Sequence, residues 1–205
     1  MNRPNNYLGR GIRMNEYTVR RYSFSELNEE ARDKAIEETR WRLLEWLREE
    51  EITDYLEGKL EEDLGSLPED ITISYSLSYC QGDGVALYGR IYKSEATDLS
   101  WPEGAYYVDL VRNSWANHYS HYNTFNVEAY DENDEPIDLA GSPIEDQLRH
   151  LCKRLETLGY RYIENETNEI SALQFLNDQE SEEEGSFLED GTRDFPRGIV
   201  QKVSA

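Results

Sequence analysis

The sequence predicts an α+β fold in which helices pack on one face of an antiparallel sheet of about four to six strands. Two observations favour this class. Between Ile71 and Tyr79, apolar and small polar side chains alternate at every position, which is typical of a strand with one buried face. Residues 28–48 and 142–159 instead carry apolar residues at helical spacing. These patterns predict one domain over residues 14–195.

The two ends of the chain differ from this domain in composition. Residues 1–13 are dominated by Asn, Arg and Gly without periodicity, which predicts a basic, flexible arm, and residues 196–205 predict a C-terminal tail. Residues 1–24 contain five Arg and one Glu. A basic arm on an acidic body usually folds back onto that body or mediates self-association, so a homo-oligomer is among the expected partners. Alternation at residues 17–19 predicts a first short strand.

Two helices are predicted before the sheet. The first begins at Asn28, a residue type that caps helix N-termini, and its apolar stripe extends to Leu47. The second is predicted to begin at Thr53 and to end at Gly65, because glycine readily adopts the left-handed conformation that closes a helix. The residues of this helix that are expected to face inward are Leu56, Leu60 and Leu64.

The centre of the chain predicts a β-hairpin. Its first strand is the alternating run that ends at Tyr79, and its second strand extends from Val85 to Tyr92. We expect this hairpin to lie at the centre of the sheet, with its apolar side chains in the core. The turn consists of Cys80, Gln81, Gly82, Asp83 and Gly84, and the expected core residues are Ile71, Ile73, Leu77, Leu87 and Ile91.

Two further strands are predicted after the hairpin. Residues 105–112 form the third strand of the expected sheet, and alternation in the second half of residues 115–128 predicts a fourth. Residues 131–135 are entirely polar and are expected to form a turn.

The last third of the chain is mainly helical in pattern. Ser142–Glu145 reads SPIE, a capping box with Pro at the first helical position, and Gly159 is the expected C-cap of that helix. One or two shorter helices are expected between Ile163 and Leu176. A small hairpin with its turn at Asp190 and Gly191 is expected over residues 186–193.

Composition and charge restrict the classes of function. The chain has 205 residues and a formal net charge of −22, which disfavours direct binding to nucleic acid or anionic membranes and favours a basic partner. No apolar run reaches the ~18 residues of a membrane span, and the N-terminus lacks the apolar region of a signal peptide. Cys80 and Cys152 lie far apart without metal-ligand spacing, which indicates reduced thiols in a cytoplasm.

The acidic residues are concentrated in three stretches. Residues 49–70 contain ten acidic residues and one Lys, residues 128–138 contain six and no basic residue, and residues 164–190 contain ten and none. Carboxylates held on a rigid surface can imitate the phosphates that a nucleic-acid-binding groove recognises. The alternative is that they only confer solubility. The candidate binding residues are Asp54, Glu57, Glu61, Glu62, Asp131, Glu132, Asp134, Glu135, Glu182, Glu183 and Glu184.

No metal, cofactor or catalytic site is predicted. His118 and His121 are three residues apart in an expected strand, where such side chains point to opposite faces, so we interpret them as polar strand residues. The acidic run at residues 131–135 lacks the Gly and Glu that a calcium loop requires. The turn at residues 81–84 lacks the Lys and the following helix of a phosphate loop. Because no acid, base and nucleophile set is recognisable, we predict a protein that is not an enzyme.

Three segments resemble a known family. They are YSFSELNEEARDKAIEE at residues 22–38, SYSLSYCQGDGVALYG at residues 74–89 and NSWANHYSHYNTFNVE at residues 113–128. The chain is similar in these segments to a family of small acidic proteins of phages and prophages, some of which are labelled antitoxin-like. The CQGDG turn is the most specific part of the resemblance. It implies a phage-encoded protein acting in the host cytoplasm, and it supplies no catalytic residues.

Two functional hypotheses follow. The first is a phage-encoded inhibitor that presents its carboxylates, as a nucleic-acid mimic, to a host protein with a basic surface, such as a defence protein or a nucleic-acid-binding protein. The second is an antitoxin-type or accessory module that covers a specific protein with its Tyr-rich hairpin. The first predicts binding that weakens strongly with salt. The second predicts little salt dependence and large losses when exposed Tyr side chains are truncated.

Overall fold

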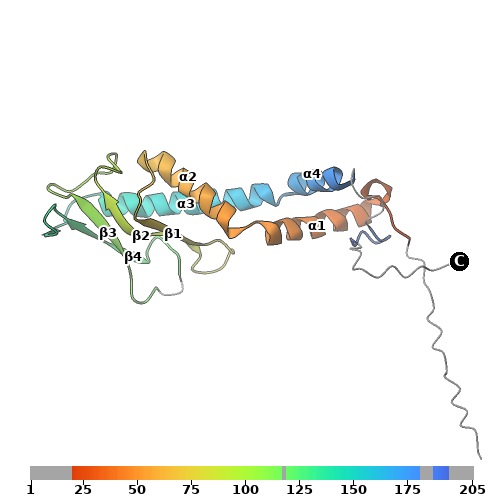
Figure 1. The fold of residues 1–205 in the computed structure, drawn as a ribbon. Helices are drawn as coiled ribbons and strands as arrows, with labels where there is room; N and C mark the ends of the chain where they lie inside the picture. The colour runs from red at the N-terminus through yellow and green to blue at the C-terminus, as the bar shows by residue number, and fades with distance from the viewer. Residues whose placement is uncertain (1–19, 117–118, 181–186, 194–205) are drawn as a thin grey trace, which may run out of the picture. The chain divides into compact units, whose positions relative to one another are not determined.

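The computed structural model of the chain describes residues 20–116, 119–180 and 187–193 (Figure 1). It has the predicted α+β fold, with an antiparallel sheet and helices. The contacts within the chain define two compact units, one made of residues 1–41 and 169–205 and the other of residues 42–168. The single domain expected over residues 14–195 therefore stays a prediction. The terminal arm and tail and the strand expected at residues 17–19 lie outside the described residues.

The sheet of the second unit is a meander, since each strand pairs with the next one in sequence. It consists of β1 (Ile71–Ser76), β2 (Gly84–Tyr92), β3 (Tyr107–Arg112), β4 (Phe125–Tyr130) and β5 (Pro136–Ile137), in that order and all antiparallel. The predicted hairpin is present as β1 and β2. Its expected central position is wrong, because β1 is an edge strand with a partner on one side only.

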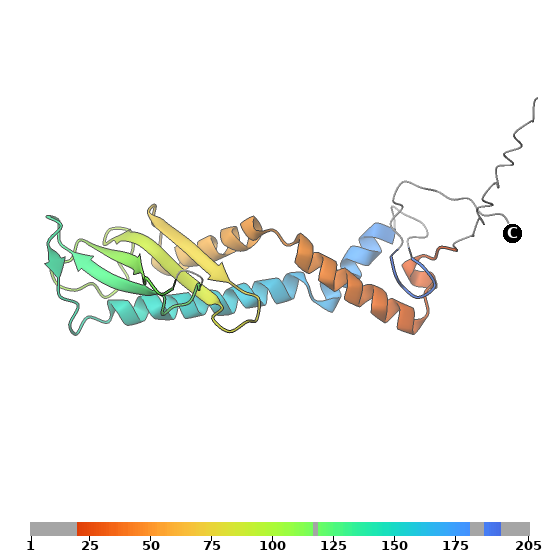
Figure 2. The same cartoon turned by 90° about the horizontal axis from the view of Figure 1, so that it is seen from below.

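Helices α2 (Glu49–Leu64) and α3 (Ile144–Glu166) lie along one face of this sheet, as predicted (Figures 1 and 2). Leu87 and Ile91 of β2 are fully buried beneath them, so these two core predictions are confirmed. Ile71, Ile73 and Leu77 are only partly buried, because β1 and the residue that follows it lie at the edge of the sheet, with a strand on one side only. The main contributors from the helices are Ile52, Leu56, Leu60, Leu64, Ile144, Leu148, Cys152 and Leu155.

Helix α2 begins earlier than predicted. The sequence suggested Thr53, but the helix begins at Glu49. The reason is that the Glu51 carboxylate caps this end: it accepts hydrogen bonds from the backbone N–H of Arg48 (3.3 Å) and from the guanidinium of Arg48 (3.0 Å). Acidic residues at the first three positions also interact favourably with the helix dipole. The end at Gly65 is confirmed, since this residue has a φ of 85° and its N–H bonds to the carbonyl of Glu61.

Helix α3 differs from its prediction at both ends. It begins at Ile144, with Pro143 in the capping position rather than inside the helix, and the Ser142 hydroxyl lies 3.4 Å from the N–H of Ile144. Gly159 is not the C-cap, because the helix continues to Glu166. This glycine is buried instead, and a Cβ at its position would lie 2.6 Å from Cδ1 of Leu77. Because Gly159 has no side chain, it leaves room for Leu77, the residue that follows β1.

The first unit has its own small core. A 3₁₀ turn (Phe24–Glu26) is followed by α1 (Glu29–Trp46). The residues of α1 up to Trp41 belong to this unit. Helix α4 (Glu169–Glu180) packs against the turn and this part of α1. The Asn28 side chain accepts a hydrogen bond from the N–H of Ala31 (2.9 Å), which confirms the predicted cap. The buried residues are Phe24, Leu27, Ala31, Ala35, Leu176 and Phe187.

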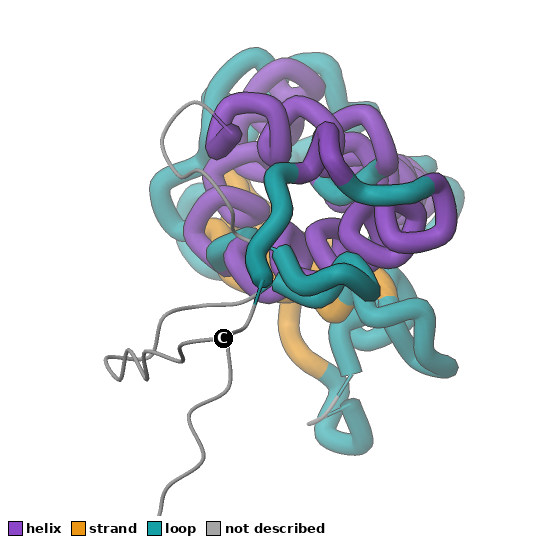
Figure 3. Tube along the Cα trace, turned by 90° about the vertical axis from the view of Figure 1, so that its right-hand side faces the viewer, coloured by secondary structure: helices purple, strands orange, loops and turns teal. Residues whose placement is uncertain are grey.

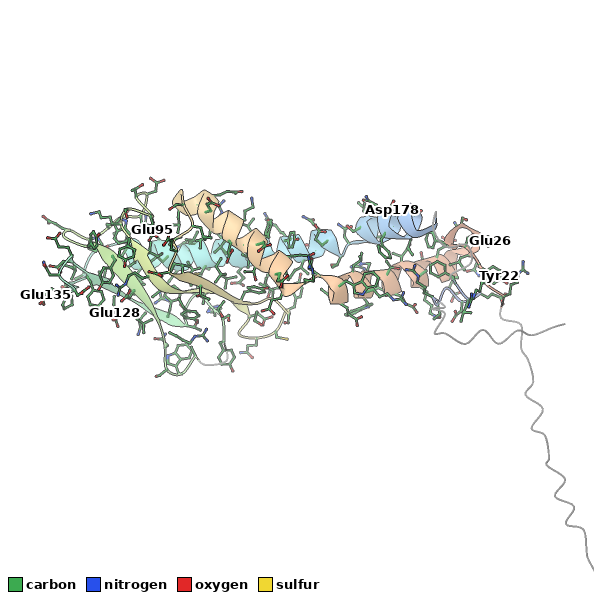
Figure 4. The ribbon with its side chains drawn as sticks, in the orientation of Figure 1. Tyr22, Glu26, Glu95, Glu128, Glu135 and Asp178 are labelled. Atoms are coloured by element: carbon green, nitrogen blue, oxygen red, sulfur yellow. The ribbon has the colours of Figure 1, made fainter. Side chains whose placement is uncertain are left out.

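Residues 187–193 complete the first unit. Phe187 pairs with Tyr22 and with Arg193, so the predicted small hairpin is present in the part that is described. Lys34 of α1 binds the Asp190 carboxylate (2.6 Å) and the Thr192 hydroxyl (2.8 Å), and this contact lowers the pKa of Asp190. Figure 4 shows the side chains of this unit, with Tyr22, Glu26 and Asp178 labelled.

Candidate functional site

The outer face of α2 carries the candidate carboxylates that are best placed to contact a partner. Asp54 and Glu61 are exposed and Glu57 is half-buried, at helical spacings of three and four residues on the side opposite the buried leucines. None of the three forms a hydrogen bond or an ion pair with the part of the chain that the structure describes. Their negative charge is therefore free to act on another molecule.

Two other acidic residues of α2 are already neutralised. The Glu62 carboxylate binds Lys59 through both oxygens (2.6 and 2.8 Å), so its charge is balanced within α2, and its role as a partner-binding residue stays a prediction. Asp63 forms an ion pair with Arg154 of α3, and its second oxygen is buried without a hydrogen-bond partner. The acidic surface of this helix is thus narrower than the sequence suggests.

The turn between β4 and β5 uses part of its charge to hold its own shape. One oxygen of Asp131 accepts the N–H groups of Asn133 (2.8 Å) and Glu135 (2.9 Å), and these bonds lower the pKa of Asp131. Asp134 has a φ of 63° and accepts the hydroxyl of Tyr107 (2.7 Å). Glu132 and Glu135 remain exposed, and Figure 4 shows Glu135 at this end of the sheet. The third candidate group, Glu182, Glu183 and Glu184, lies outside the described residues.

The Cys80–Gly84 turn is organised by one carboxylate. Asp83 accepts hydrogen bonds from the Ser76 hydroxyl (2.6 Å) and from the N–H groups of Ser78 and Cys80 (both 2.7 Å), with the Tyr160 hydroxyl of α3 at 3.4 Å. Burial alone would raise the pKa of Asp83, but these hydrogen bonds outweigh it and the pKa is lowered. Asp83 is therefore ionised and is occupied in closing the turn.

Two glycines of this turn permit close contact with the loop between β3 and β4, of which residues 113–116 and 119–124 are described (Figures 1 and 3). Gly82 has a φ of 95°, and a Cβ there would lie 2.6 Å from Cδ1 of Tyr119. A Cβ on Gly84 would lie 3.1 Å from the Ser120 carbonyl and 3.2 Å from Cδ2 of His121. The glycines thus let the turn and the loop form one surface.

This turn–loop surface borders an open hollow of about 510 Å³. Trp115 and Tyr119, which are 65% and 48% exposed, are two of its walls. Such rings on a protein surface are typical of binding sites, because they bury a large apolar area at little cost in conformational entropy. The remaining wall residues are Gln81, Gly82, Asp83, His121, Asn123 and Thr124.

A second carboxylate lies beside the hollow. Oε2 of Glu156, on α3, would be 3.1 Å from a Cβ on Gly84, close to His121. Burial, and then the negative charge of Asp83, raise the pKa of Glu156, while Lys153 acts in the opposite direction. Glu156 forms no hydrogen bond or ion pair among the described residues. It is a partly buried negative charge that the fold does not compensate directly.

The histidine interpretation needs a correction. His121 is in a loop rather than in a strand, because the Thr124 side chain and N–H both bond to its carbonyl and close a turn. Burial, and then the charge of Lys153, lower its pKa, so the ring is neutral at neutral pH. His118 lies outside the described residues. Among the residues that the structure describes, no group of His, Cys, Asp and Glu is suited to bind a metal.

The two cysteines differ in their surroundings. Cys152 is fully buried among the core residues, and burial raises its pKa to about 12, so its thiol is not ionised. Cys80 is exposed beside the Asp83 turn. Nothing in this arrangement assembles a nucleophile with a base, and the prediction that the chain is not an enzyme stays a prediction.

The sequence singled out the turn but missed its surroundings. Trp115, Tyr119 and Glu156 lie between 31 and 72 positions beyond Gly84, the last residue of the turn, and no local pattern connects them to it. The available signal was the resemblance, since the segments at residues 74–89 and 113–128 both carry it and both contribute to the hollow.

Comparisons with protein-family models, with curated proteins and with solved structures gave no match for this chain. Among the described residues, no helix is both long and apolar enough to cross a membrane.

Proposed function

We propose that this chain is a binding protein without catalytic activity that attaches to a protein partner with a basic surface. The observation that carries the proposal is the set of Asp54, Glu57 and Glu61, three carboxylates without partners among the described residues, on a helix fixed by four buried side chains. Because the helix packs against α3 and the sheet, these charges are presented in a defined geometry. The resemblance to small acidic phage proteins suggests the biological role: an inhibitor that a phage makes against a defence or nucleic-acid-binding protein in the host cytoplasm.

Electrostatics explain how such a surface would act. The net charge of −22 attracts a basic protein over the screening length of about 8 Å at physiological ionic strength. Carboxylates at helical spacing then contact cationic side chains that otherwise bind phosphates. Attraction of this kind raises the association rate more than it slows dissociation.

The test compares three versions of the full chain as bait in a host lysate, at low and at high salt. They are the natural sequence, a triple variant with Asp54, Glu57 and Glu61 changed to Lys, and a matched variant with Asp98, Glu103 and Asp146 changed to Lys. The matched residues are also exposed and lie outside α2. We expect a partner retained by the natural chain and by the matched variant but lost with the α2 variant and with salt. A partner bound equally by all three would reject the acidic face.

A second function is favoured by a different observation. Tyr79, Trp115 and Tyr119 are 72%, 65% and 48% exposed around the Cys80–Gly84 turn, which suits an antitoxin-type or accessory module that binds through aromatic contacts. In that case binding would change little with salt and would weaken by about 100-fold when Trp115 and Tyr119 are changed to Ala. Retained binding in that double variant would exclude this second function.

A further inference from the structure

The hollow beside the Cys80–Gly84 turn combines two features that seldom occur together on a surface. One is aromatic: Trp115 and Tyr119 are exposed, and the Tyr119 ring is held in place because it lies directly on Gly82. The other is negative charge. Asp83 is a wall residue, and Oε2 of Glu156 lies 3.1 Å from the position that a Cβ on Gly84 would take.

The negative charge is not balanced by the fold. The hydrogen bonds to Asp83 come from neutral groups, so they orient its charge without cancelling it. Glu156 has neither a hydrogen bond nor an ion pair among the described residues. Lys153 is the cation that acts on it, yet its ammonium group is placed over the Tyr122 ring, 4.1 Å from the centroid. His121 is neutral at neutral pH. A cation entering the hollow would therefore meet two carboxyl groups that have no ion pair among the described residues.

The same protein shows which cation suits such surroundings. On the sheet face not covered by helices, Arg90 forms two bonds to the Asp109 carboxylate (2.7 and 2.9 Å) and places its guanidinium 3.7 Å from the centroid of the Tyr107 ring. A guanidinium is flat, so it can stack on a ring and still direct two N–H groups at a carboxylate, which a lysine ammonium cannot do as well. The hollow offers the ring and the carboxylate without the arginine.

We propose that the hollow lined by Trp115, Tyr119 and Asp83, with Glu156 beside it, binds the guanidinium group of an arginine side chain supplied by another protein. The volume of about 510 Å³ lies within the range of small-ligand sites. The inference rests on the proposed function only for the source of the arginine, because a basic partner presents such side chains. The site is separate from the carboxylates on α2.

The experiment uses the full chain labelled with ¹⁵N and the capped tripeptide acetyl-Gly-Arg-Gly-amide. Binding is followed by the indole N–H signal of Trp115 in NMR spectra, assigned with Trp115→Phe. We expect a saturable shift of this signal at peptide concentrations up to about 10 mM, as suits a single contact of low affinity. The matching citrulline peptide, which has the same shape without the charge, should produce no shift.

Variants identify the groups responsible. Glu156→Gln should weaken the peptide about tenfold, whereas Glu164→Gln, at an exposed position of the same helix, should leave it unchanged. Gly82→Ala should also weaken it, because the added Cβ displaces Tyr119. An equal response to the citrulline peptide, or an unchanged affinity in Glu156→Gln, would overturn the proposal. A response to free arginine but not to the peptide would overturn the assignment to a partner side chain.

The result is independent of the lysate experiment. Failure of the peptide to bind, together with a partner that is lost on reversal of the α2 charges, would reject this site and leave the proposed function intact. The converse result, peptide binding without any dependence on α2, would reject the acidic face and retain the arginine site.

Discussion

The outer face of α2 and the Cys80–Gly84 turn both carry carboxylates, and they use them in opposite ways. Asp83 in the turn accepts three hydrogen bonds of 2.6–2.7 Å, so its charge serves the fold. Asp54, Glu57 and Glu61 accept none from the described chain, so their charge contributes nothing specific to the fold. Acidic residues that look equivalent in the sequence therefore have to be separated by what they contact, because a carboxylate such as Asp83 shapes the fold while those on α2 are left to a partner alone.

The largest expected effect that tests this comparison is on the turn. Asp83→Ala should reduce the free energy of unfolding by about 2–4 kcal/mol, because two backbone N–H groups and a hydroxyl lose a charged acceptor. Urea unfolding followed by circular dichroism measures this, with Asp98→Ala as an exposed control. Since the pKa of Asp83 is lowered by folding, its contribution is present above its ordinary pKa and is lost as the pH falls through the lowered value. A decrease in the free energy of unfolding of less than about 0.5 kcal/mol would show that Asp83 does not stabilise the turn.

A smaller effect is expected at Gly82, the glycine that precedes Asp83. Gly82→Ala should cost about 1–2 kcal/mol, because an alanine is strained at a φ of 95° and its Cβ would meet the Tyr119 ring. Gly58→Ala is the matched control, since Gly58 lies within α2 with no atom near the added Cβ. That change should stabilise by about 0.5–1 kcal/mol. Equal effects at the two positions would show that the turn and the loop do not depend on each other.

On α2, charge reversal should barely affect the fold. The triple change of Asp54, Glu57 and Glu61 to Lys is expected to shift the Tm by less than about 3 °C, and upward, because it relieves repulsion within an acidic chain without breaking a contact. Thermal melts at low salt measure the shift. A Tm lowered by about 10 °C would mean that these carboxylates are structural like Asp83.

The smallest expected effect on stability tests whether Glu156 is a partly buried carboxyl group without a stabilising contact. Its pKa is raised by burial, so ionisation weakens the folded state once the pH exceeds the ordinary carboxyl pKa. Glu156→Gln should therefore raise the Tm by about 1–2 °C near pH 7 and have almost no effect near pH 3, about one unit below the ordinary carboxyl pKa, where the natural residue is protonated in both states. Melts across this pH range, with Glu164→Gln as control, provide the measurement. A Tm that falls near pH 7 would reveal a stabilising contact for this carboxylate.

The sequence by itself determined the features that depend on residues a few positions apart. Alternation along the chain predicted β1 and β2, the side chain of Asn28 predicted the start of α1, and Gly65 predicted the end of α2. Each of these is a local preference of the backbone that the packing of the unit left in place. The fold class followed from the order of such elements.

The tertiary structure decided what depends on residues far apart in sequence. β1 became an edge strand because nothing in its own residues specifies a second neighbour. Gly159 was expected to end α3 but lies inside it, since the packing of Leu77 requires a residue without a side chain there. Likewise the hollow forms where the turn and the β3–β4 loop meet. Contacts of this kind are fixed by the packing of the whole unit, and for that reason no local pattern contained them.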